Sequence, residues 1–366
     1  MKNTTQQKTF LIAAGGTGGH IIPGIAIAKE LLMRGHRCTF VGTHRGLEHR
    51  LVPEAGFKIE FVNVGPWNGA SPARRLKTVL QLASGLPAAA SILEKTAPAA
   101  ILSLGGYTAA AIVMTALGAD VPIVVMEPNV RPGLVNRLTG PFATWALVGF
   151  KETMRWFPEA RCELSGIPIR SEFFDIPPRT VRSPFTVLVT GGSLGAKRLN
   201  EAIVRAVEIW RNAGSWEQMN LIHQTGELEY EKIRAAFAGL ESSVKLMAFI
   251  DDMPRAFAAA DIVICRAGAS TLAEIGAAAK PSLLVPYSFA TDQHQLANAK
   301  VMTDSGAARL IVDQELDGER LAREVTLLMD DPKTLRSMES AARRLARPGA
   351  IEKVADRLES VANLRS

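Results

Sequence analysis

A glycine-rich segment between a strand and a helix places the strongest constraint on the fold of this chain. Residues 15–20 read Gly-Gly-Thr-Gly-Gly-His, between the apolar run Phe10–Ala14 and an amphipathic pattern that opens near Pro23. A strand, a glycine turn and a helix in this order aim backbone N–H groups and the positive end of the helix dipole at an anion. The segment therefore predicts an α/β fold with an anion site at this turn. A tight turn that binds nothing is the alternative.

The segment lacks the residues that the two commonest phosphate loops require. A dinucleotide fingerprint that starts at Gly16 needs a third glycine at position 21, which is Ile21. A Walker loop needs Lys followed by Ser or Thr after its last glycine, whereas His20 and Ile21 follow here. Nicotinamide dehydrogenases and Walker-type proteins are therefore disfavoured.

The charge of the chain favours an anionic partner. Its 42 Lys and Arg outnumber its 36 Asp and Glu, which gives a formal net charge of +6. A phosphorylated substrate and an anionic membrane surface both fit this balance. Nucleic acid is disfavoured, because no Lys/Arg-rich run or known reader motif occurs and aromatic residues make up only 6% of the chain.

The apolar runs and the cysteines predict a cytosolic protein. Met1–Lys8 is polar and the next apolar run is short, so no secretory signal is expected. The longest uncharged run, Ala99–Ala119, has Gly105–Thr108 in its middle and predicts a strand, a turn and a helix instead of a membrane span. The three cysteines are widely spaced, which is typical of core residues in a reducing compartment.

Short apolar runs alternate with helical patterns in the first half of the chain, which predicts right-handed βαβ crossovers and a parallel sheet. We expect strands at residues 10–14, 39–42, 60–64, 100–104, 121–126 and 145–148. In such sheets, ligands bind beyond the carboxyl ends of the strands. Residues 15–20, 105–108 and 127–129 form loops at that edge.

The same arrangement returns in the second half, after a proline-interrupted stretch at residues 170–184 that predicts a linker. Phe185–Val189 is expected to be a strand, Gly191–Ala196 is a second glycine-rich turn, and a helix is expected from Leu199. This repeat predicts two Rossmann-like domains with a shared cleft, and a single large domain is the alternative. Further strands are expected at 220–223, 244–249, 261–265 and 282–285, and helices at 334–345 and 350–364.

Two polar segments in the second half suit a phosphorylated and hydroxylated ligand. Residues 266–274 form a turn that opens a helix, where Ser270 and Thr271 are either caps or phosphate contacts. Glu274 either belongs to the cap or accepts hydrogen bonds from ribose hydroxyls. Residues 286–298 are rich in amides and hydroxyls, which suits a polyhydroxylated ligand, with a solvated loop as the alternative.

Six motifs in a fixed order are similar to those of one enzyme family. They are Gly-Gly-Thr-Gly-Gly-His at 15–20, Gly-Gly-Tyr at 105–107, Pro-Gly-Leu-Val-Asn at 132–136, Gly-Gly-Ser-Leu-Gly-Ala at 191–196, Phe-Ile-Asp-Asp-Met at 249–253 and Cys-Arg-Ala-Gly-Ala at 265–269. From about Phe10 to the last helix, the chain resembles the MurG family of peptidoglycan N-acetylglucosaminyltransferases. The resemblance implies the GT-B fold, in which two Rossmann-like parallel-sheet domains face a cleft and the C-terminal helix crosses back to the first domain. It also implies an inverting transfer of GlcNAc from UDP-GlcNAc to the C4 hydroxyl of MurNAc in lipid I, which gives lipid II.

The resemblance divides the chain into three parts. Residues 1–168 would be the acceptor- and membrane-facing domain, 169–346 the UDP-GlcNAc-binding domain and 347–366 the returning helix. Ile250 would pack by the uracil, and Arg170 would contact the nucleotide. The full set of implied substrate-binding residues is Thr17, Gly18, Gly19, Tyr107, Asn129, Arg170, Ser193, Ile250, Arg266, Ala269, Ser270, Thr271, Leu272, Ala273, Glu274, His294 and Gln295.

The expected chemistry needs a base but no metal or other cofactor. Helix N-termini can stabilise the charge that develops on a departing diphosphate, and no Asp-x-Asp motif occurs. His20 is the first candidate for the base, with binding of a phosphate as its alternative role. Glu127 is the second candidate. The chain has Glu127-Pro128-Asn129 where the family is expected to have Glu-Gln-Asn, so a role for that glutamine is lost here.

A lipid-linked acceptor implies a peripheral location on the cytoplasmic face of the bacterial inner membrane, with other cell-wall synthesis proteins as candidate partners. An apolar helical face with basic neighbours would suit the anionic membrane surface, and a core-facing helix explains the same spacing. The predicted membrane patch comprises Trp67, Arg74, Arg75, Leu76, Lys77, Val79 and Leu80.

Three other functions remain as alternatives. They are a GT-B-shaped UDP-GlcNAc 2-epimerase, a glycolipid glycosyltransferase and a non-catalytic nucleotide-sugar-binding protein. Tyr107, Asn129 and the region around Arg74 discriminate among the enzymes, because they lie on the acceptor side.

Overall fold

The computed structural model describes residues 6–15, 18–44, 46–64, 72–192, 195–288 and 293–364, with the backbone alone for residues 72–82. The chain forms two compact units. Unit 1 comprises residues 1–169 together with 349–366, and unit 2 comprises residues 170–348. Each unit is built around one parallel sheet.

The sheet of unit 1 has seven strands in the order β3-β2-β1-β4-β5-β6-β7, and every pairing is parallel. The strands are β1 (Thr9–Ala13), β2 (Arg37–Gly42), β3 (Lys58–Phe61), β4 (Ala100–Ser103), β5 (Ile123–Glu127), β6 (Trp145–Val148) and β7 (Cys162–Leu164). The helices of unit 1 are α1 (Gly18–Met33), α2 (Glu48–Glu54), α3 (Pro72–Thr96), α4 (Tyr107–Gly118), α5 (Leu134–Thr139) and α13 (Ala350–Ala362).

Successive residues of β1 point into different cores, as the period of two in a strand requires. Phe10 and Ile12 pack with side chains of α1, α2 and α13 on one face of the sheet. Leu11 and Ala13 pack with side chains of α3 and α4 on the other face. Both faces are covered, which explains why the central strands read as continuous apolar runs.

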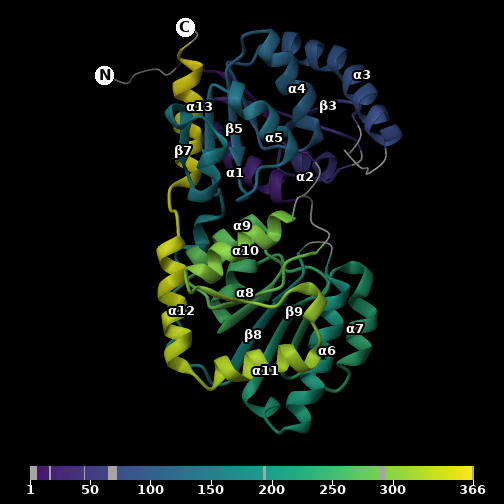
Figure 1. Cartoon of the computed structure of the whole chain (residues 1–366), viewed down its shortest axis with the longest axis vertical. Coiled ribbons are helices and arrows are strands. Elements are labelled where there is room, and N and C mark those ends of the chain that lie inside the picture. Colours follow the sequence, from purple (N-terminus) through teal and green to yellow (C-terminus); the bar gives the residue numbers. More distant parts are fainter. Residues whose placement is uncertain are drawn as a thin grey trace. The chain divides into compact units, whose positions relative to one another are not determined.

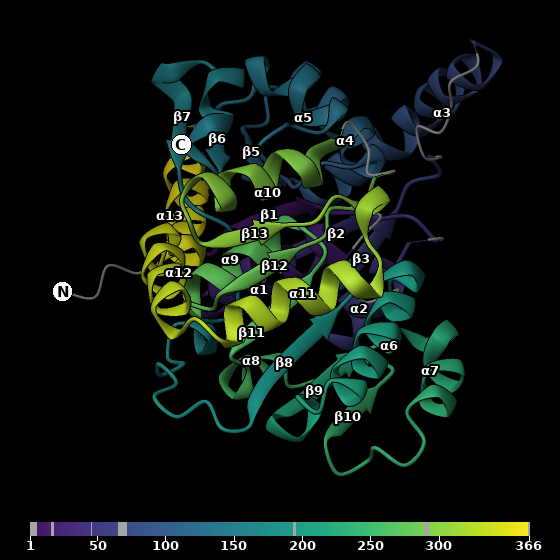
Figure 2. The ribbon, with the colours of Figure 1, turned by 60° about the horizontal axis from the view of Figure 1, so that its bottom comes forward.

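The sheet of unit 2 has six parallel strands in the order β10-β9-β8-β11-β12-β13. The strands are β8 (Phe185–Thr190), β9 (Met219–Gln224), β10 (Val244–Met247), β11 (Ile262–Cys265), β12 (Ser282–Leu284) and β13 (Ala308–Leu310). The helices are α6 (Lys197–Asn212), α7 (Tyr230–Ala236), α8 (Met253–Ala259), α9 (Ala269–Ala277), α10 (His294–Asp304), α11 (Gly318–Met329) and α12 (Pro332–Leu345). Helices α6 and α11 lie side by side, and their apolar faces share one core (Figure 2).

The last helix, α13, belongs to unit 1 although it follows unit 2 in the chain (Figure 1). Val354 and Leu358 are fully buried in the core beside α1. Glu359 pairs with the Arg34 guanidinium at 2.9 Å and with His36 Nε2 at 2.8 Å. The predicted pair of Rossmann-like sheets and the return of the last helix to the first domain are therefore confirmed.

Several predicted boundaries differ from the structure. The third strand is Lys58–Phe61 instead of 60–64, and the fifth is Ile123–Glu127 instead of 121–126. The edge strands β7 and β13 were not predicted, because each has three residues and only its first is buried. A strand that short, with one buried residue, shows no alternation along the sequence.

The predicted linker at residues 170–184 was wrong for most of its length, because this segment packs against unit 2. Phe173, in a short 3-10 helix at Ser171–Phe173, is fully buried edge-to-face against Phe257. Arg179 and Arg182 pair with the buried Asp261 carboxylate at 2.9 Å and 3.4 Å. Prolines interrupt regular structure in a segment, but they do not prevent its side chains from packing.

Candidate active site

In each sheet, the sequence order of neighbouring strands changes direction at one point. A ligand-binding crevice is expected at the carboxyl edge of the sheet at that point. In unit 1 the reversal lies between β1 and β4, and in unit 2 it lies between β8 and β11. The predicted glycine turns follow β1 and β8, and the segments that follow β4 and β11 open helices α4 and α9. The topology therefore brings the predicted motifs of each unit to one edge of its sheet.

In unit 1, the two glycine loops are in direct contact. A Cβ on Gly15 would lie 2.0 Å from Thr108 Oγ1, and a Cβ on Gly106 would lie 2.9 Å from the Gly15 carbonyl oxygen. Gly106 also has φ +80°, a conformation that favours glycine. His20, in the first turn of α1, places Nδ1 3.3 Å from the same carbonyl oxygen. Tyr107 begins α4 and is partly exposed at this edge.

The Glu127 carboxylate organises the loop after β5. It is buried and accepts four hydrogen bonds, from the backbone N–H groups of Asn129 (2.9 Å) and Gly133 (3.0 Å) and from the side-chain amides of Asn129 (3.1 Å) and Asn136 (2.9 Å). Thr153 Oγ1 donates to the Asn129 carbonyl at 3.0 Å. Asn136, the last residue of the Pro-Gly-Leu-Val-Asn motif, thus fixes the Glu127 carboxylate by a hydrogen bond, and this carboxylate in turn fixes Asn129.

In unit 2, the second glycine turn lies against the end of β9. Gly195 has φ +75°, and a Cβ there would lie 2.1 Å from the Thr225 carbonyl oxygen. The Asn200 side chain on α6 donates to the same oxygen at 2.9 Å. Gly195 N–H donates to the Gly192 carbonyl at 3.0 Å, which closes the turn.

Three of the helices at the two reversal points, α4, α6 and α9, begin without a side-chain cap. Helices α4, α6 and α9 follow Gly106, Ala196 and Gly268, and none has an acidic residue in its first turn. By contrast, aspartate side chains cap α8, α11 and α12. Backbone N–H groups at an uncapped N-terminus can bind an anion, and no carboxylate competes for them in the first turn.

The second residue of α4 and the second residue of α9 carry equivalent hydroxyls. Thr108 Oγ1 and Ser270 Oγ are both buried, and neither has a hydrogen-bond partner among the described residues. A buried hydroxyl without a partner is costly, so each marks a position where a bound acceptor or donor would be favourable. Ser270 was predicted as a substrate contact, whereas Thr108 was not.

Glu274 lies one turn along α9. Burial raises the pKa of its carboxyl to about 7, and the positive charge of Arg170 acts in the opposite direction. Arg170 is exposed, donates to the Asp251 carbonyl at 3.5 Å, and lies over the Phe173 ring. Arg170, Ile250 and Glu274, which were predicted to contact the nucleotide, all belong to unit 2.

Arg266 is held by its own unit. Its Nη1 atom lies 2.6 Å from Asp313 Oδ1 and 3.1 Å from the Val285 carbonyl, and its guanidinium lies over the Tyr287 ring. Tyr287 N–H in turn donates to the predicted sugar contact Gln295 at 2.9 Å. This geometry favours a role for Arg266 in fixing Val285–Tyr287, and its predicted contact with substrate stays a prediction.

The sequence did not single out Gln224, the last residue of β9. Its buried amide donates to the Gly192 carbonyl at 2.9 Å and to Thr190 Oγ1 at 3.3 Å, and it accepts from Ile250 N–H at 2.9 Å. Its only signal in the sequence is a polar residue at the end of an apolar strand, next to a glycine-containing turn.

Some predicted residues lie outside the described part of the chain. These are Thr17, Ser193 and Trp67. Residues 74–80 lie on α3, whose backbone confirms a helix there, but their side chains are outside the description. His294 begins α10, and Ala269, Thr271, Leu272 and Ala273 lie in the first turns of α9.

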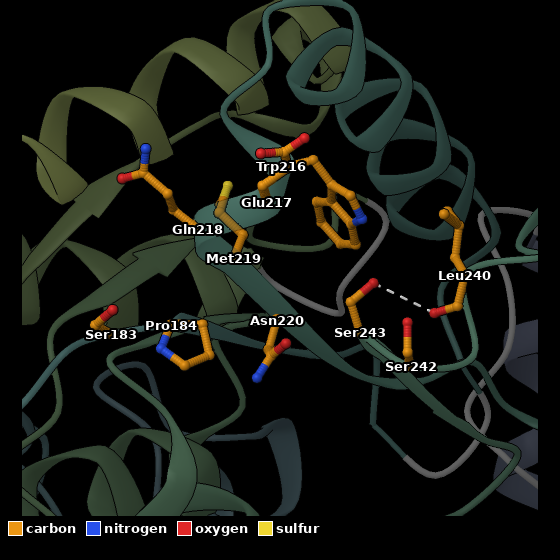
Figure 3. A pocket seen from close by; sticks show the side chains of 10 residues that line it. All are labelled: Ser183, Pro184, Trp216, Glu217, Gln218, Met219, Asn220, Leu240, Ser242 and Ser243. Atoms are coloured by element: carbon orange, nitrogen blue, oxygen red, sulfur yellow. Dashed lines mark hydrogen bonds between the residues drawn. The ribbon is translucent and has the colours of Figure 1, made fainter.

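A pocket of about 560 Å³ lies at the opposite edge of the unit 2 sheet (Figure 3). Ser183 and Pro184 line it just before β8, and Met219 and Asn220 line it at the start of β9. The glycine turns lie at the carboxyl ends of the same strands. This pocket is therefore separate from the predicted site.

The described residues include neither a cluster of metal ligands nor a membrane-spanning helix. No three His, Cys, Asp or Glu side chains there come together in a way that could hold a metal ion. No helix in the same part of the chain is both long and apolar enough to cross a bilayer.

Comparison with known proteins identifies the family. The glycosyltransferase family 28 N-terminal domain matches residues 10–148, and the glycosyltransferase family 28 C-terminal domain matches residues 186–356. A Solibacter usitatus protein is 45% identical over 98% of this chain and 97% of its own length. It is named UDP-N-acetylglucosamine--N-acetylmuramyl-(pentapeptide) pyrophosphoryl-undecaprenol N-acetylglucosamine transferase, as is a Myxococcus xanthus relative at 39% identity. The chain belongs to the MurG family.

Solved structures agree with this assignment. The crystal structure of Acinetobacter baumannii MurG has a TM-score of 0.78 and 29% identity, and the match covers 97% of this chain and 99% of that one. A Neisseria meningitidis UDP-GlcNAc 2-epimerase bound to UDP-GlcNAc has a TM-score of 0.69 at 13% identity, covering 96% and 100% of the two chains. The second likeness shows the shared GT-B fold alone. Four of the six motifs follow β1, β4, β8 and β11, the strands at the reversal points of this fold, and the other two follow β5 and β10.

Proposed function

We propose that this chain transfers GlcNAc from UDP-GlcNAc to the C4 hydroxyl of MurNAc in lipid I, with inversion at the anomeric carbon, to give lipid II. The observation that carries this proposal is the full-length match to MurG relatives at up to 45% identity. The two uncapped, carboxylate-free helix N-termini at the reversal point of unit 2 support it. They suit the diphosphate of a nucleotide sugar.

The donor is assigned to unit 2. Backbone N–H groups at the start of α9 and the unpartnered Ser270 hydroxyl would bind diphosphate, and the Glu274 carboxylate would accept from the ribose hydroxyls. Ile250 would pack by the uracil, and Gln295 with His294 would bind the sugar hydroxyls. Arg170, close enough to Glu274 to lower its pKa, would contact the nucleotide.

The reaction is a single displacement. The acceptor oxygen attacks C1 of GlcNAc while the bond from C1 to the diphosphate oxygen breaks, so negative charge develops on the departing UDP. Helix N-termini can stabilise that charge, and we therefore propose that the enzyme needs no metal or other cofactor. The proton of the acceptor hydroxyl passes to a base.

His20 is assigned as this base. It lies at the reversal point of unit 1, in the first turn of α1. Glu127 is the weaker candidate, because both of its oxygens already accept two hydrogen bonds each. Protonation of Glu127 would cost at least one of these bonds. Thr17, Gly18, Gly19, Tyr107 and Asn129 are assigned to the substrates on the unit 1 side.

The acceptor carries a lipid, so the enzyme is proposed to act at the cytoplasmic face of the inner membrane. The basic and apolar residues 74–80 lie on one helix, α3, which suits contact with anionic lipid. Residues 1–168 would then be the acceptor domain and 169–346 the donor domain. Other cell-wall synthesis proteins are proposed as partners at the same surface.

The test is the release of UDP from UDP-GlcNAc in the presence of a short-chain lipid I analogue and EDTA. Turnover that requires the analogue and persists in EDTA would support the transferase and its independence of metal. Binding of UDP-GlcNAc without acceptor-dependent turnover would contradict the proposal. Epimerised UDP-sugar would then identify an epimerase, and an unchanged donor would identify a binding protein.

A further inference from the structure

Gln224 joins two loops that come from different strands of unit 2. Its Nε2 atom donates to the Gly192 carbonyl, in the turn after β8, at 2.9 Å. Its Oε1 atom accepts from Ile250 N–H, in the segment after β10, at 2.9 Å. Because β9 lies between β8 and β10 in the sheet, one side chain at its end spans both neighbours.

The amide is fully engaged by the protein. Its second donor reaches Thr190 Oγ1 at 3.3 Å, and that hydroxyl also accepts from Gly192 N–H at 3.2 Å. Only 1% of the Gln224 surface is exposed. Burial of an amide is unfavourable unless its hydrogen bonds are made. Gln224 can make its hydrogen bonds to both loops only when the distance between the loops is fixed.

The segment after β10 has other anchors, but among the described residues none of these hydrogen bonds reaches the glycine turn. Asp252 caps α8 by accepting from Arg255 N–H at 3.1 Å, and Arg170 donates to the Asp251 carbonyl at 3.5 Å. These contacts fix the segment against α8 and the start of unit 2. Gln224 is the residue that fixes it against Gly192.

We propose that Gln224 is a positioning residue for the nucleoside diphosphate of the donor. It sets the distance between Ile250, at the nucleobase end of the site, and the glycine turn at its diphosphate end. This inference rests on the proposed function, because it takes UDP as the ligand of that edge. A ligand that contacts both ends loses affinity when their separation changes, whereas the chemical step loses little once the donor is bound.

Gln224→Met tests the proposal, because methionine has a similar length and cannot replace the hydrogen bonds. We expect the Kd for UDP to rise at least about tenfold, while kcat at saturating UDP-GlcNAc falls less than about threefold. The matched control is Thr326→Val, which removes the Trp210 Nε1–Thr326 Oγ1 hydrogen bond (3.2 Å) between α6 and α11. This control lowers stability in the same unit and is expected to keep the wild-type Kd for UDP.

Gln224→Glu provides an independent test that also applies if the methionine variant does not fold. Its ionised carboxyl can still accept from Ile250 N–H, but it repels the Gly192 carbonyl oxygen. A protonated carboxyl can donate to that oxygen. We therefore expect UDP affinity, expressed relative to wild type at the same pH, to be low at pH 8 and to recover towards pH 5.5.

Titration calorimetry with UDP separates the outcomes. Wild-type Kd values in the folded Gln224 variants would overturn the positioning role and leave the proposed function intact. A fall in affinity for Thr326→Val as large as that for Gln224→Met would also overturn it, because general destabilisation would then explain both. A wild-type chain that does not bind UDP would overturn the proposed function and this inference together.

Discussion

Glu127, which is buried, and Glu274, which is partly exposed, differ in what surrounds their carboxyl groups. Burial raises the pKa of both. Four hydrogen bonds act in the opposite direction on Glu127, whereas for Glu274 the only opposing influence is the charge of Arg170. Four donors hold the Glu127 carboxyl group in place, whereas Glu274, with a pKa of about 7, is able to change its protonation state near neutral pH.

Substitution of His20 and of Glu127 should affect the reaction differently. His20→Ala removes the proposed base, so kcat should fall by about 10²–10⁴-fold while the Kd for UDP stays near wild type.

Glu127→Gln places an amide N–H₂ group against the donors of Gly133 or Asn129, so it should raise KM for the lipid acceptor. The measurement is kcat/KM for a lipid I analogue from pH 5 to pH 9. Glu127→Gln should keep the fall of kcat/KM at low pH, which reports protonation of the base. If this fall disappears in Glu127→Gln, the base is Glu127 instead.

The donor affinity should depend on pH through Glu274. A carboxylate accepts hydrogen bonds from ribose hydroxyls, and the pKa of about 7 means that roughly half of the free enzyme is protonated there at pH 7. KM for UDP-GlcNAc should therefore fall as the pH rises from 6 to 8. Glu274→Gln should have a higher KM that is flat over this range. An unchanged pH dependence in this variant would rule out Glu274 as its source.

At the scale of the elements, the glycine turns and the helices that follow them were predictable because their signal is local. A positive φ or a close backbone contact requires glycine, and an apolar run before it marks the buried strand. The hydrogen bonds of Gln224 were not predictable, because they join residues that lie 26 to 34 positions apart in the sequence. The edge strands β7 and β13 were missed because short, half-exposed strands depend on their neighbours for pairing.

Two glycines in the turn after β8 allow a matched comparison. Gly192 and Gly195 both have positive φ, at +84° and +75°. A Cβ at Gly192 would meet no atom of the described residues within 4 Å, whereas at Gly195 it would lie 2.1 Å from the Thr225 carbonyl oxygen. Gly192→Ala should lower the free energy of unfolding by about 1 kcal/mol through backbone strain alone. Gly195→Ala should lower the free energy of unfolding by clearly more than Gly192→Ala does, and it should also weaken UDP binding. Urea denaturation measures the first effect and titration calorimetry the second. Equal losses of unfolding free energy in the two variants would contradict the close approach of Gly195 to the Thr225 carbonyl.

At the scale of the whole molecule, acid stability should depend on His223. This residue is fully buried between β9 and α6, and burial lowers its pKa from 6.5 to about 3. The unfolded chain therefore takes up a proton below pH 6.5 that the folded chain does not, so stability is lost as the pH falls from about 6.5 towards 3.

The free energy of unfolding should accordingly fall by several kcal/mol between about pH 6.5 and pH 4, since one pKa unit corresponds to about 1.4 kcal/mol. His223→Gln retains a donor for Asn200 and has no proton to gain, so its unfolding free energy should change less over this interval. His49→Gln, at an exposed position, is the control and should keep the wild-type slope. A wild-type slope in His223→Gln would show that other groups cause the acid sensitivity.

The return of α13 to unit 1 determines the order in which the two units can be completed during translation. All strands of unit 2 lie within one continuous stretch, residues 170–348. The core around Phe10, Ile12 and Leu102 lacks Val354 and Leu358 until the ribosome has released residues beyond unit 2. Domains usually finish folding from the N-terminus onward during synthesis. The unit that comes first in this sequence is therefore completed after unit 2, and until then the face of its sheet beneath α13 lacks that cover.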